Sequence, residues 1–313
     1  MEIRYAQEND IPSIVGLLKV SLGEDRTPKS EALWRWKHLE NPFGQSPVLL
    51  AEKNGEILGV RAFLRWNWQE DGKTFRALRA VDTAVHPNHL AQGIFSKLTS
   101  SLVDDSASKG FDFIFNTPNS KSLPGYQKMG WLKQGKIPIK LQFNSLSKQD
   151  SAMELPVMDR ALFATLAEQC RPLTQGLHTP ITKEFLLWRY SDCPIFPYGF
   201  CTDRESYLFV FRLKPSGLGL ELRITDCFGL DVQKEINLEH LRQELKKTQE
   251  IFKVNFTTHI GHFPIPLLRK TGSLPSLNIG PLLTLRDLNL GKDFSRLLTS
   301  ENWGFSLGDL EVF

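Results

Sequence analysis

The stretch "VHPNHLAQGIFSKL", Val85–Leu98, joins an apolar run to a segment with helical spacing. A His-Pro corner and a short polar turn separate the two, and Gln92-Gly93 begins the second segment. The first N–H groups of a helix have no carbonyl partners within that helix. Together with the positive end of the helix dipole they form a site suited to a pyrophosphate. We therefore expect the phosphates of a nucleotide to bind at this corner.

The residues around this corner predict a mixed sheet covered by helices. Before it, we expect a strand at 2–6, helices at 10–22 and 30–41, and three antiparallel strands over 47–85. Asn54-Gly55 and Asp71-Gly72 separate these strands, and such pairs form tight hairpin turns. After the corner we expect a helix at about 92–109, a strand at 111–118, a short helix near 122–130 and a strand at 136–143. The sequence thus predicts an α/β (α+β) domain over residues 1–143 with a mostly antiparallel sheet.

The second half of the chain repeats the first faintly. A polar stretch at 144–158 has no periodicity and is a candidate linker. Beyond it, "TPITKEFLLWRYSDCP" at 179–194 resembles "TPKSEALWRWKHLENP" at 27–42, with a Trp-Arg pair in each. Acidic residues Asp231, Glu235 and Glu239 stand where the second copy would bind phosphates, and they would repel a pyrophosphate. We expect residues 159–313 to form a degenerate second copy in tandem with the first, so that only the first binds the nucleotide.

Composition and charge exclude several classes of protein. The 313 residues are 41% hydrophobic and 23% charged, with a net charge of +3, which is ordinary for a globular protein and gives no basic field for nucleic acid. We expect no membrane span and a cytoplasmic location, because no apolar stretch approaches 18 residues and the N-terminus carries charges. The four cysteines contain no C-x-x-C pair, so we expect free thiols and no metal site.

Two motifs resemble the GNAT superfamily of acetyl-CoA-dependent N-acyltransferases over residues 1–143. The first is the family's Q/R-x-x-G-x-G/A signature after V-H-P, of which Gln92 and Gly93 are present, while Leu90 and Phe95 replace the usual outer residues. The second is "NSKSLPGYQKMGW" at 119–131, which is similar to the family's N-x-x-x-x-x-x-Y-x-K-x-G-F pattern. A small residue at the position of Phe95 normally lets phosphate approach the backbone closely.

The resemblance implies a role for each of these segments. In such enzymes the strand at 80–85 leaves its neighbour, and its backbone pairs with the pantetheine arm of acetyl-CoA as an added strand would. Tyr126 matches the family's general acid, and Asp82, the carboxylate on this strand, is the candidate base. The residues expected to bind acetyl-CoA, as co-substrate, are Val81, Thr83, Ala84, Val85, Gln92, Gly93, Ile94, Phe95, Ser96, Asn116 and Asn119.

Each of these roles has a structural alternative. Tyr126 could be a packing residue, Asn119 could cap its own helix, and Asp82 could point into the other face of the sheet. A second candidate base is the C-terminal stretch with Asp309, Glu311 and the α-carboxylate of Phe313. The tryptophans near the start, Trp34, Trp66 and Trp68 among them, suit either a core or a stacking platform for the acceptor.

We therefore expect an N-acetyltransferase that moves an acetyl group from acetyl-CoA directly to a primary amine of a small molecule or amino sugar. The expected partner is a small-molecule amine, with no nucleic acid and no membrane, and a homo-oligomer is compatible with the sequence. Two alternatives stay open. One is a non-catalytic GNAT-fold binding or regulatory module, and the other is a Fem-type aminoacyl-tRNA-dependent transferase, which also has two GNAT-like domains.

Overall fold

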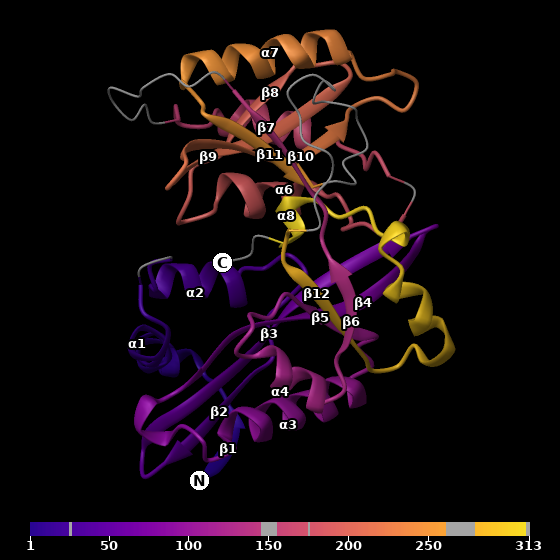
Figure 1. Ribbon diagram of the computed structural model, residues 1–313. Coiled ribbons are helices and arrows are strands. Elements are labelled where there is room, and N and C mark those ends of the chain that lie inside the picture. Colours follow the sequence, from indigo (N-terminus) through magenta and orange to yellow (C-terminus); the bar gives the residue numbers. More distant parts are fainter. Residues whose placement is uncertain (25–26, 145–154, 175, 261–278, 311–313) are drawn as a thin grey trace. The chain divides into compact units, whose positions relative to one another are not determined.

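The computed structural model describes residues 1–24, 27–144, 155–174, 176–260 and 279–310. The chain forms two compact units, residues 1–135 with 282–300 and residues 136–281 with 301–313. In the described residues each unit has one sheet, of seven strands in the first and five in the second, flanked by helices (Figure 1). This is the mixed, mostly antiparallel α/β (α+β) fold expected from the sequence.

The first unit follows the expected order of elements as far as Lys128, and its last two strands, Leu132–Lys136 and Leu282–Asp287, were not predicted. Its elements are β1 (Glu2–Tyr5), η1 (Glu8–Asp10), α1 (Ile11–Leu22), α2 (Glu31–His38), β2 (Val48–Lys53), β3 (Glu56–Glu70), β4 (Lys73–Val85), η2 (Pro87–His89), α3 (Ile94–Ser108), β5 (Phe113–Asn116), α4 (Leu123–Lys128), β6 (Leu132–Lys136), β12 (Leu282–Asp287) and η4 (Gly291–Leu298). The strands lie in the order β1-β2-β3-β4-β5-β12-β6. Helices α1 and α2 cover one face of this sheet, and α3 and α4 cover the other (Figure 1).

Local turn chemistry explains the long β3–β4 hairpin. Asn54-Gly55 and Asp71-Gly72 both adopt positive φ, as the tight turns at the two ends of β3 require. Between them, Trp66 and Trp68 are fully buried in the sheet, and Trp34 is 5% exposed. The tryptophans are therefore core residues of the unit and form no exposed stacking platform.

Two irregularities in β4 shape the centre of the first unit. The β3–β4 register shifts between Arg61, which pairs with Thr83, and Ala62, which pairs with Val81. Asp82 is thus the extra residue of a β-bulge, at φ +40°. Further, β4 pairs with the parallel strand β5 only from Ala77 to Arg79. Beyond this point the two strands separate, which leaves a notch beside residues 80–85.

The second unit has a related arrangement. Its elements are β7 (Ile139–Phe143), α5 (Arg160–Ala167), α6 (Lys183–Leu186), the π-helical turn η3 (Leu187–Ser191), β8 (Gly199–Thr202), β9 (Tyr207–Ser216), β10 (Gly219–Gly229), α7 (Leu238–Ile251), β11 (Phe256–Ile260) and α8 (Leu307–Leu310), with η5 (Ser300–Asn302) at the border of the units. A hairpin, β9–β10, again contains a bulge, between Ile224 and Asp226. Strand β11 runs parallel to β10, as β5 does to β4.

The units differ from the expected boundaries because two strands are exchanged. Residues 136–143 were expected to end the first sheet, but β7 pairs with β11 in the second sheet. Conversely, β12 pairs with β5 and completes the first sheet. The expected divisions at 143 and 159 therefore do not coincide with the compact units, and most of the expected linker, 145–154, lies outside the described residues.

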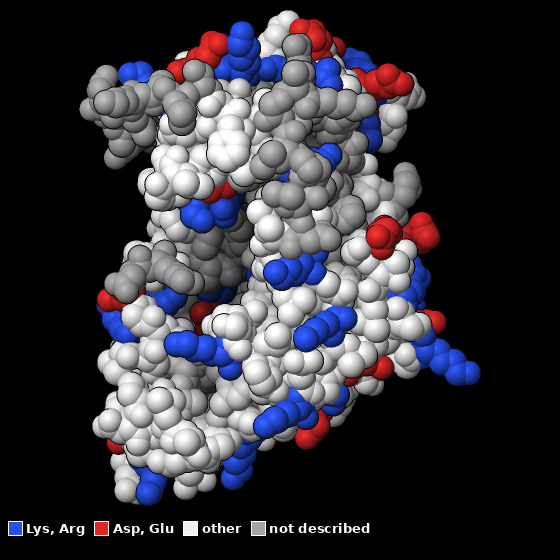
Figure 2. Space-filling model, viewed as in Figure 1, with Lys and Arg blue, Asp and Glu red and all other residues white. Residues whose placement is uncertain are grey.

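The surface carries charges of both signs. On the face shown in Figure 2, lysines and arginines are scattered among uncharged and acidic side chains. Among the described residues, no helix has both the length and the apolar character needed to cross a bilayer.

Candidate functional site

The notch in the first unit opens into a cleft of about 520 Å³. Strand β4 supplies residues 80–85, the end of β5 and the following loop supply 116–119, and α4 supplies Tyr126. Of the residues predicted from the sequence, the cleft brings together Val81, Asp82, Thr83, Ala84, Val85, Phe95, Asn116, Asn119 and Tyr126. Gln92, Gly93, Ile94 and Ser96 belong to the adjoining helix start and do not line it.

Asp82 is held by two side chains of α2. Its Oδ2 accepts from Lys37 Nζ at 2.8 Å and lies 2.9 Å from His38 Nε2. The His38 Nδ1 in turn lies 2.9 Å from Ser46 Oγ. The side chains of Lys37 and His38 are almost fully buried, whereas Asp82 lines the cleft and is 10% exposed. The bulge therefore turns Asp82 toward α2 while its neighbour Thr83 faces Arg61.

This cluster fixes the charge of Asp82. Burial alone would raise its pKa, but the ammonium of Lys37 and the hydrogen bond from His38 hold the pKa of Asp82 well below its usual range. Burial lowers the pKa values of Lys37 and His38, although Asp82 opposes both shifts. His38 is thus neutral at pH 7. Since a carboxylate only accepts, Nε2 carries the imidazole hydrogen and Nδ1 accepts from Ser46.

Tyr126 lies on α4, in the wall of the cleft, and is 5% exposed. Its hydroxyl accepts a hydrogen bond from Arg61 Nη1 at 2.8 Å. The ring packs edge-on against Phe95, with centroids 5.6 Å apart, and lies tilted against Trp131, with centroids 5.1 Å apart. Phe95, which replaces the family's small residue, therefore directs its ring toward α4, where it also lies close to Gly125.

The corner before α3 has the geometry of an anion site. Ala91 and Gly93 both adopt positive φ, of 62° and 75°, and Gly93 is an N-cap without a side-chain hydrogen bond to the helix. Successive N–H groups in such a turn converge on one point. Gln92 and Ser96 are exposed, whereas Ile94 is buried and can offer a ligand only its backbone. In contrast, helix α7 of the second unit is capped by the side chain of its own Asn237.

The two predicted asparagines have partners within the protein. Asn116 is buried at the end of β5, and its Oδ1 accepts from Thr284 Oγ1 at 2.5 Å. The Oδ1 of Asn119 accepts from the backbone of Lys121 and Ser122, at 3.0 and 2.9 Å. The side-chain oxygen of Asn119 thus holds the loop that leads into α4.

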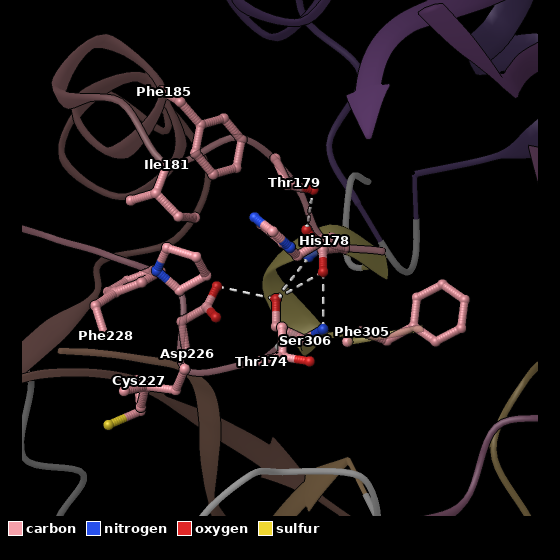
Figure 3. A pocket seen from close by; sticks show the side chains of 14 residues that line it. Thr174, His178, Thr179, Ile181, Phe185, Asp226, Cys227, Phe228, Phe305 and Ser306 are labelled. Carbon is pink, nitrogen blue, oxygen red and sulfur yellow. Dashed lines mark hydrogen bonds between the residues drawn. The ribbon is translucent and has the colours of Figure 1, made fainter. Parts of the chain in front are cut away.

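A second cavity, of about 50 Å³, lies in the second unit (Figure 3). Asp226 and Asp309 both accept from Ser306 Oγ, at 2.9 and 3.1 Å. Asp309 also accepts from Thr179 at 2.5 Å and is 4% exposed. Of the C-terminal candidates, Asp309 is therefore a buried carboxyl of this unit, while Glu311 and Phe313 lie outside the described residues.

Sequence reasoning missed Lys37, His38, Ser46 and Arg61. One local signal was the Lys-His pair on the predicted helix at 30–41, beside the Trp-Arg-Trp run that the repeat had marked. A charged pair on the apolar side of a helix indicates a buried partner of opposite charge. Arg61 lies within an apolar strand and gave the same kind of signal.

Comparisons with known proteins identify the class. Residues 2–133 match the model of the acetyltransferase (GNAT) domain family. Over 147 residues, 44% of this chain, the protein is 28% identical to the L-amino acid N-acyltransferase MnaT of Escherichia coli K12, of which the match covers 83%. It is 26% identical to the L-methionine sulfoximine/L-methionine sulfone acetyltransferase of Salmonella typhimurium LT2, covering 44% of this chain and 84% of that protein. These matches support a GNAT acetyltransferase domain over residues 2–133 and a GNAT-type N-acetyltransferase as the class of enzyme.

Solved structures share the fold over most of the chain. A GCN5-related N-acetyltransferase from Anabaena variabilis has a TM-score of 0.63 at 15% identity, with 92% of this chain and 74% of that chain covered. Eis1 from Mycobacterium abscessus gives 0.59 at 14% identity, with 93% and 74% covered. At such low identities these likenesses describe the fold alone.

Proposed function

We propose that this protein transfers an acetyl group from acetyl-CoA to the primary amine of a small molecule, and that the acceptor is an α-amino acid. The observation that carries the proposal is the cleft of the first unit, where the open edge of β4, the uncapped start of α3 and Tyr126 adjoin one another. The names of the two relatives, which refer to L-amino acids and to methionine derivatives, favour an amino acid over an amino sugar.

The donor would bind along β4 and α3. The backbone of residues 80–85 has one edge paired with β3 and the other open toward the cleft, so it can pair with the pantetheine amides. The pyrophosphate would then lie at the turn containing Ala91 and Gly93, on the N–H groups of Ile94, Phe95 and Ser96. Because no side chain caps the start of α3, none has to move before the pyrophosphate binds.

The acceptor amine would meet Asp82. Both hydrogen bonds to this carboxylate use Oδ2, and within the described residues its Oδ1 has no partner, so Oδ1 can bind an ammonium group. A carboxylate with so low a pKa orients the amine but retains no proton, so the proton passes on to water. The amine nitrogen then attacks the thioester carbon, the C–S bond breaks, and the Tyr126 hydroxyl gives its hydrogen to the sulfur. The nitrogen releases its second proton to water, which leaves the neutral amide.

We also propose that the second unit is a degenerate GNAT-like copy. Each unit has a Trp-Arg segment before a hairpin, and each hairpin contains a bulge at or beside an aspartate, Asp82 or Asp226. A side chain of the Trp-Arg segment holds the aspartate in both units, Lys37 in the first and Tyr190 in the second. Asn237 caps the start of α7, and the acidic residues Asp231 and Glu235 precede it. This helix start is therefore unsuited to binding a phosphate.

Calorimetric titration with acetyl-CoA tests the donor site. Gly93→Asp places a carboxylate in the phosphate corner, and Gly110→Asp makes the same change beyond the other end of α3, at a glycine of almost equal φ (75° and 74°). We expect micromolar binding by the wild type, Tyr126→Phe and Gly110→Asp, and none by Gly93→Asp. Thiol release should then follow when amino acids are supplied.

Other results would contradict the proposal in recognisable ways. Binding of acetyl-CoA without turnover of any amine would favour the non-catalytic binding module. Absence of binding at millimolar acetyl-CoA would leave two alternatives, the non-catalytic binding module and the aminoacyl-tRNA-dependent transferase, which needs no CoA site. Turnover of amino sugars but not of amino acids would retain the activity and overturn the acceptor class.

A further inference from the structure

Arg61 is a buried cation without a carboxylate. It lies on β3 opposite Thr83, its side chain is fully buried, and the part of the chain that the structure describes contains no ion pair to it. Its Nη1 donates to the hydroxyls of Tyr126 and Thr83. Within the same described residues, its Nε and Nη2 have no hydrogen-bond partner. A buried guanidinium with unused donors is costly, so its position needs an explanation.

Aromatic rings offset only part of this cost. The guanidinium carbon lies 4.8 Å from the ring centroid of Phe63, 5.3 Å from that of Tyr126 and 5.8 Å from that of Phe95. Such cation–π contacts are stabilising, but they leave the unused N–H donors unsatisfied. The charge thus remains largely uncompensated directly behind two residues of the cleft wall, Thr83 and Tyr126.

The direction of the hydrogen bond decides what Tyr126 can do. A guanidinium has only donors, so the phenol oxygen must accept from Arg61. The hydrogen of the Tyr126 hydroxyl therefore cannot point back at Arg61 and is available for donation elsewhere, including to a group in the cleft. Without Arg61, the hydroxyl could rotate and donate to an internal acceptor.

We propose that Arg61 is a positioning residue that directs the Tyr126 hydroxyl toward the sulfur of the thioester, an inference that rests on the proposed function. As the C–S bond breaks, the proton moves from the Tyr126 oxygen to the sulfur. The positive charge of Arg61 stabilises the negative charge on the phenol oxygen until a proton from solvent replaces the one transferred. Arg61 itself contacts neither the amine nor the thioester and acts through the Tyr126 oxygen.

The test compares Arg61→Met and Arg61→Lys with Arg65→Met, which removes another arginine from the same face of β3. We expect Arg61→Met to lower kcat on the order of 10- to 100-fold with little change in KM for acetyl-CoA, because one general acid contributes about 10²–10⁴-fold. Arg61→Lys should restore part of the rate, and Arg65→Met should keep it. In a Tyr126→Phe background, Arg61→Met should cause no further loss.

A multiplicative loss in the double variant, or an effect confined to KM, would overturn the inference. A readout without turnover separates it from the proposed function. In protein labelled with 3-fluorotyrosine, the ¹⁹F resonance that Tyr126→Phe removes should shift in Arg61→Met and stay in place in Arg65→Met. If the wild type acetylates no amine, the proposed function fails. An unshifted resonance in both Arg61 variants would instead show that Arg61 does not hold this hydroxyl.

Discussion

Asp82 has a backbone conformation, φ +40°, that asparagine and aspartate adopt more easily than other residues with a Cβ. The bulge that produces this conformation also turns the carboxylate toward Lys37 and His38. The sequence could nominate Asp82 from its strand, but its partners are 45 and 44 residues away and no local pattern connects them. The charge state of the residue therefore follows from tertiary contacts, which the sequence alone does not reveal.

Asp82→Asn should destabilise the first unit at neutral pH. Asparagine keeps the backbone conformation, but the substitution leaves the buried ammonium of Lys37 without its counter-charge, which costs about 3–5 kcal/mol. Because the folded pKa of Asp82 is lowered, its contribution is present above the unfolded value of about 4 and is lost as the pH falls below it. The deficit of the variant should therefore shrink in acid.

Urea unfolding between pH 3 and pH 8 measures this effect. Asp71→Asn is a matched control, since Asp71 also has positive φ, +49°, but lies in an exposed hairpin turn. It should unfold as the wild type does. An Asp82→Asn protein with unchanged stability at pH 7 would show that Lys37 does not depend on this ion pair.

At the scale of elements, local chemistry was sufficient where a turn or cap specifies it. Asn54-Gly55 and Asp71-Gly72 correctly predict the two hairpin turns. Pro12 and Ser30 correctly predict where α1 and α2 begin. Helix α3 begins at Ile94, two residues after the predicted start, because Gly93 is a left-handed N-cap outside the helix. No residue pattern in β4 or β5 predicts that the pairing of these two strands ends at Arg79.

Gly59 allows α3 to pack closely on the sheet. A Cβ at this position would lie 2.7 Å from Cγ2 of Ile94 and 3.2 Å from Cδ1 of Leu98, both on α3. Gly59→Ala should therefore push the start of α3 away from β3, costing about 1–3 kcal/mol. Because the proposed phosphate site is this same helix start, affinity for acetyl-CoA should fall with stability.

Thermal unfolding and calorimetric titration on one preparation check both effects. Gly16→Ala, in α1, meets nothing within 4 Å and should raise stability by about 0.5–1 kcal/mol without a change in binding. If Gly59→Ala kept both the melting temperature and the affinity of the wild type, the packing argument for the helix start would be wrong.

On the scale of the molecule, the two units should respond oppositely to pH. Asp226 is buried, and both burial and the nearby Asp309 raise its pKa, against hydrogen bonds from Tyr190 and Ser306 and the charge of Arg189. A carboxyl with a raised folded pKa contributes stability below its unfolded value of about 4, and this contribution is lost as the pH rises through the folded value. The second unit should thus weaken from pH 5 to pH 8.

Asp226→Asn should remove much of this pH dependence, since the amide cannot ionise but can still accept from the two hydroxyls. Hydrogen exchange of amides in β9 and β10 at pH 5 and pH 8, corrected for intrinsic rates, reports on this unit. Asp192→Asn, at a largely exposed ion pair with Arg160, is the control. Equal protection of the wild-type strands at both pH values would contradict the expectation.

The sequence does not predict that β7 joins the second sheet and β12 the first. The pattern at 136–143 correctly predicts a strand, but alternation does not say which sheet the strand joins, because its partner, β11, is more than a hundred residues away. In the first sheet β12 lies between β5 and β6. A protein cut at residue 143 therefore lacks an internal strand of the very sheet that carries the cleft.

Residues 1–143 expressed alone should for this reason be insoluble or partly unfolded, since an open β5 edge invites pairing with other chains. A second version, in which a Gly/Ser linker joins residues 1–135 to 279–300, restores β12 and should be soluble. With β5 paired again, its Asn116 regains the hydrogen bond from Thr284, and acetyl-CoA should bind. Circular dichroism and size-exclusion chromatography of the two proteins decide the matter. A stable, monomeric 1–143 fragment that binds acetyl-CoA would mean that the first sheet closes without β12 and that the boundary expected from the sequence was the functional one.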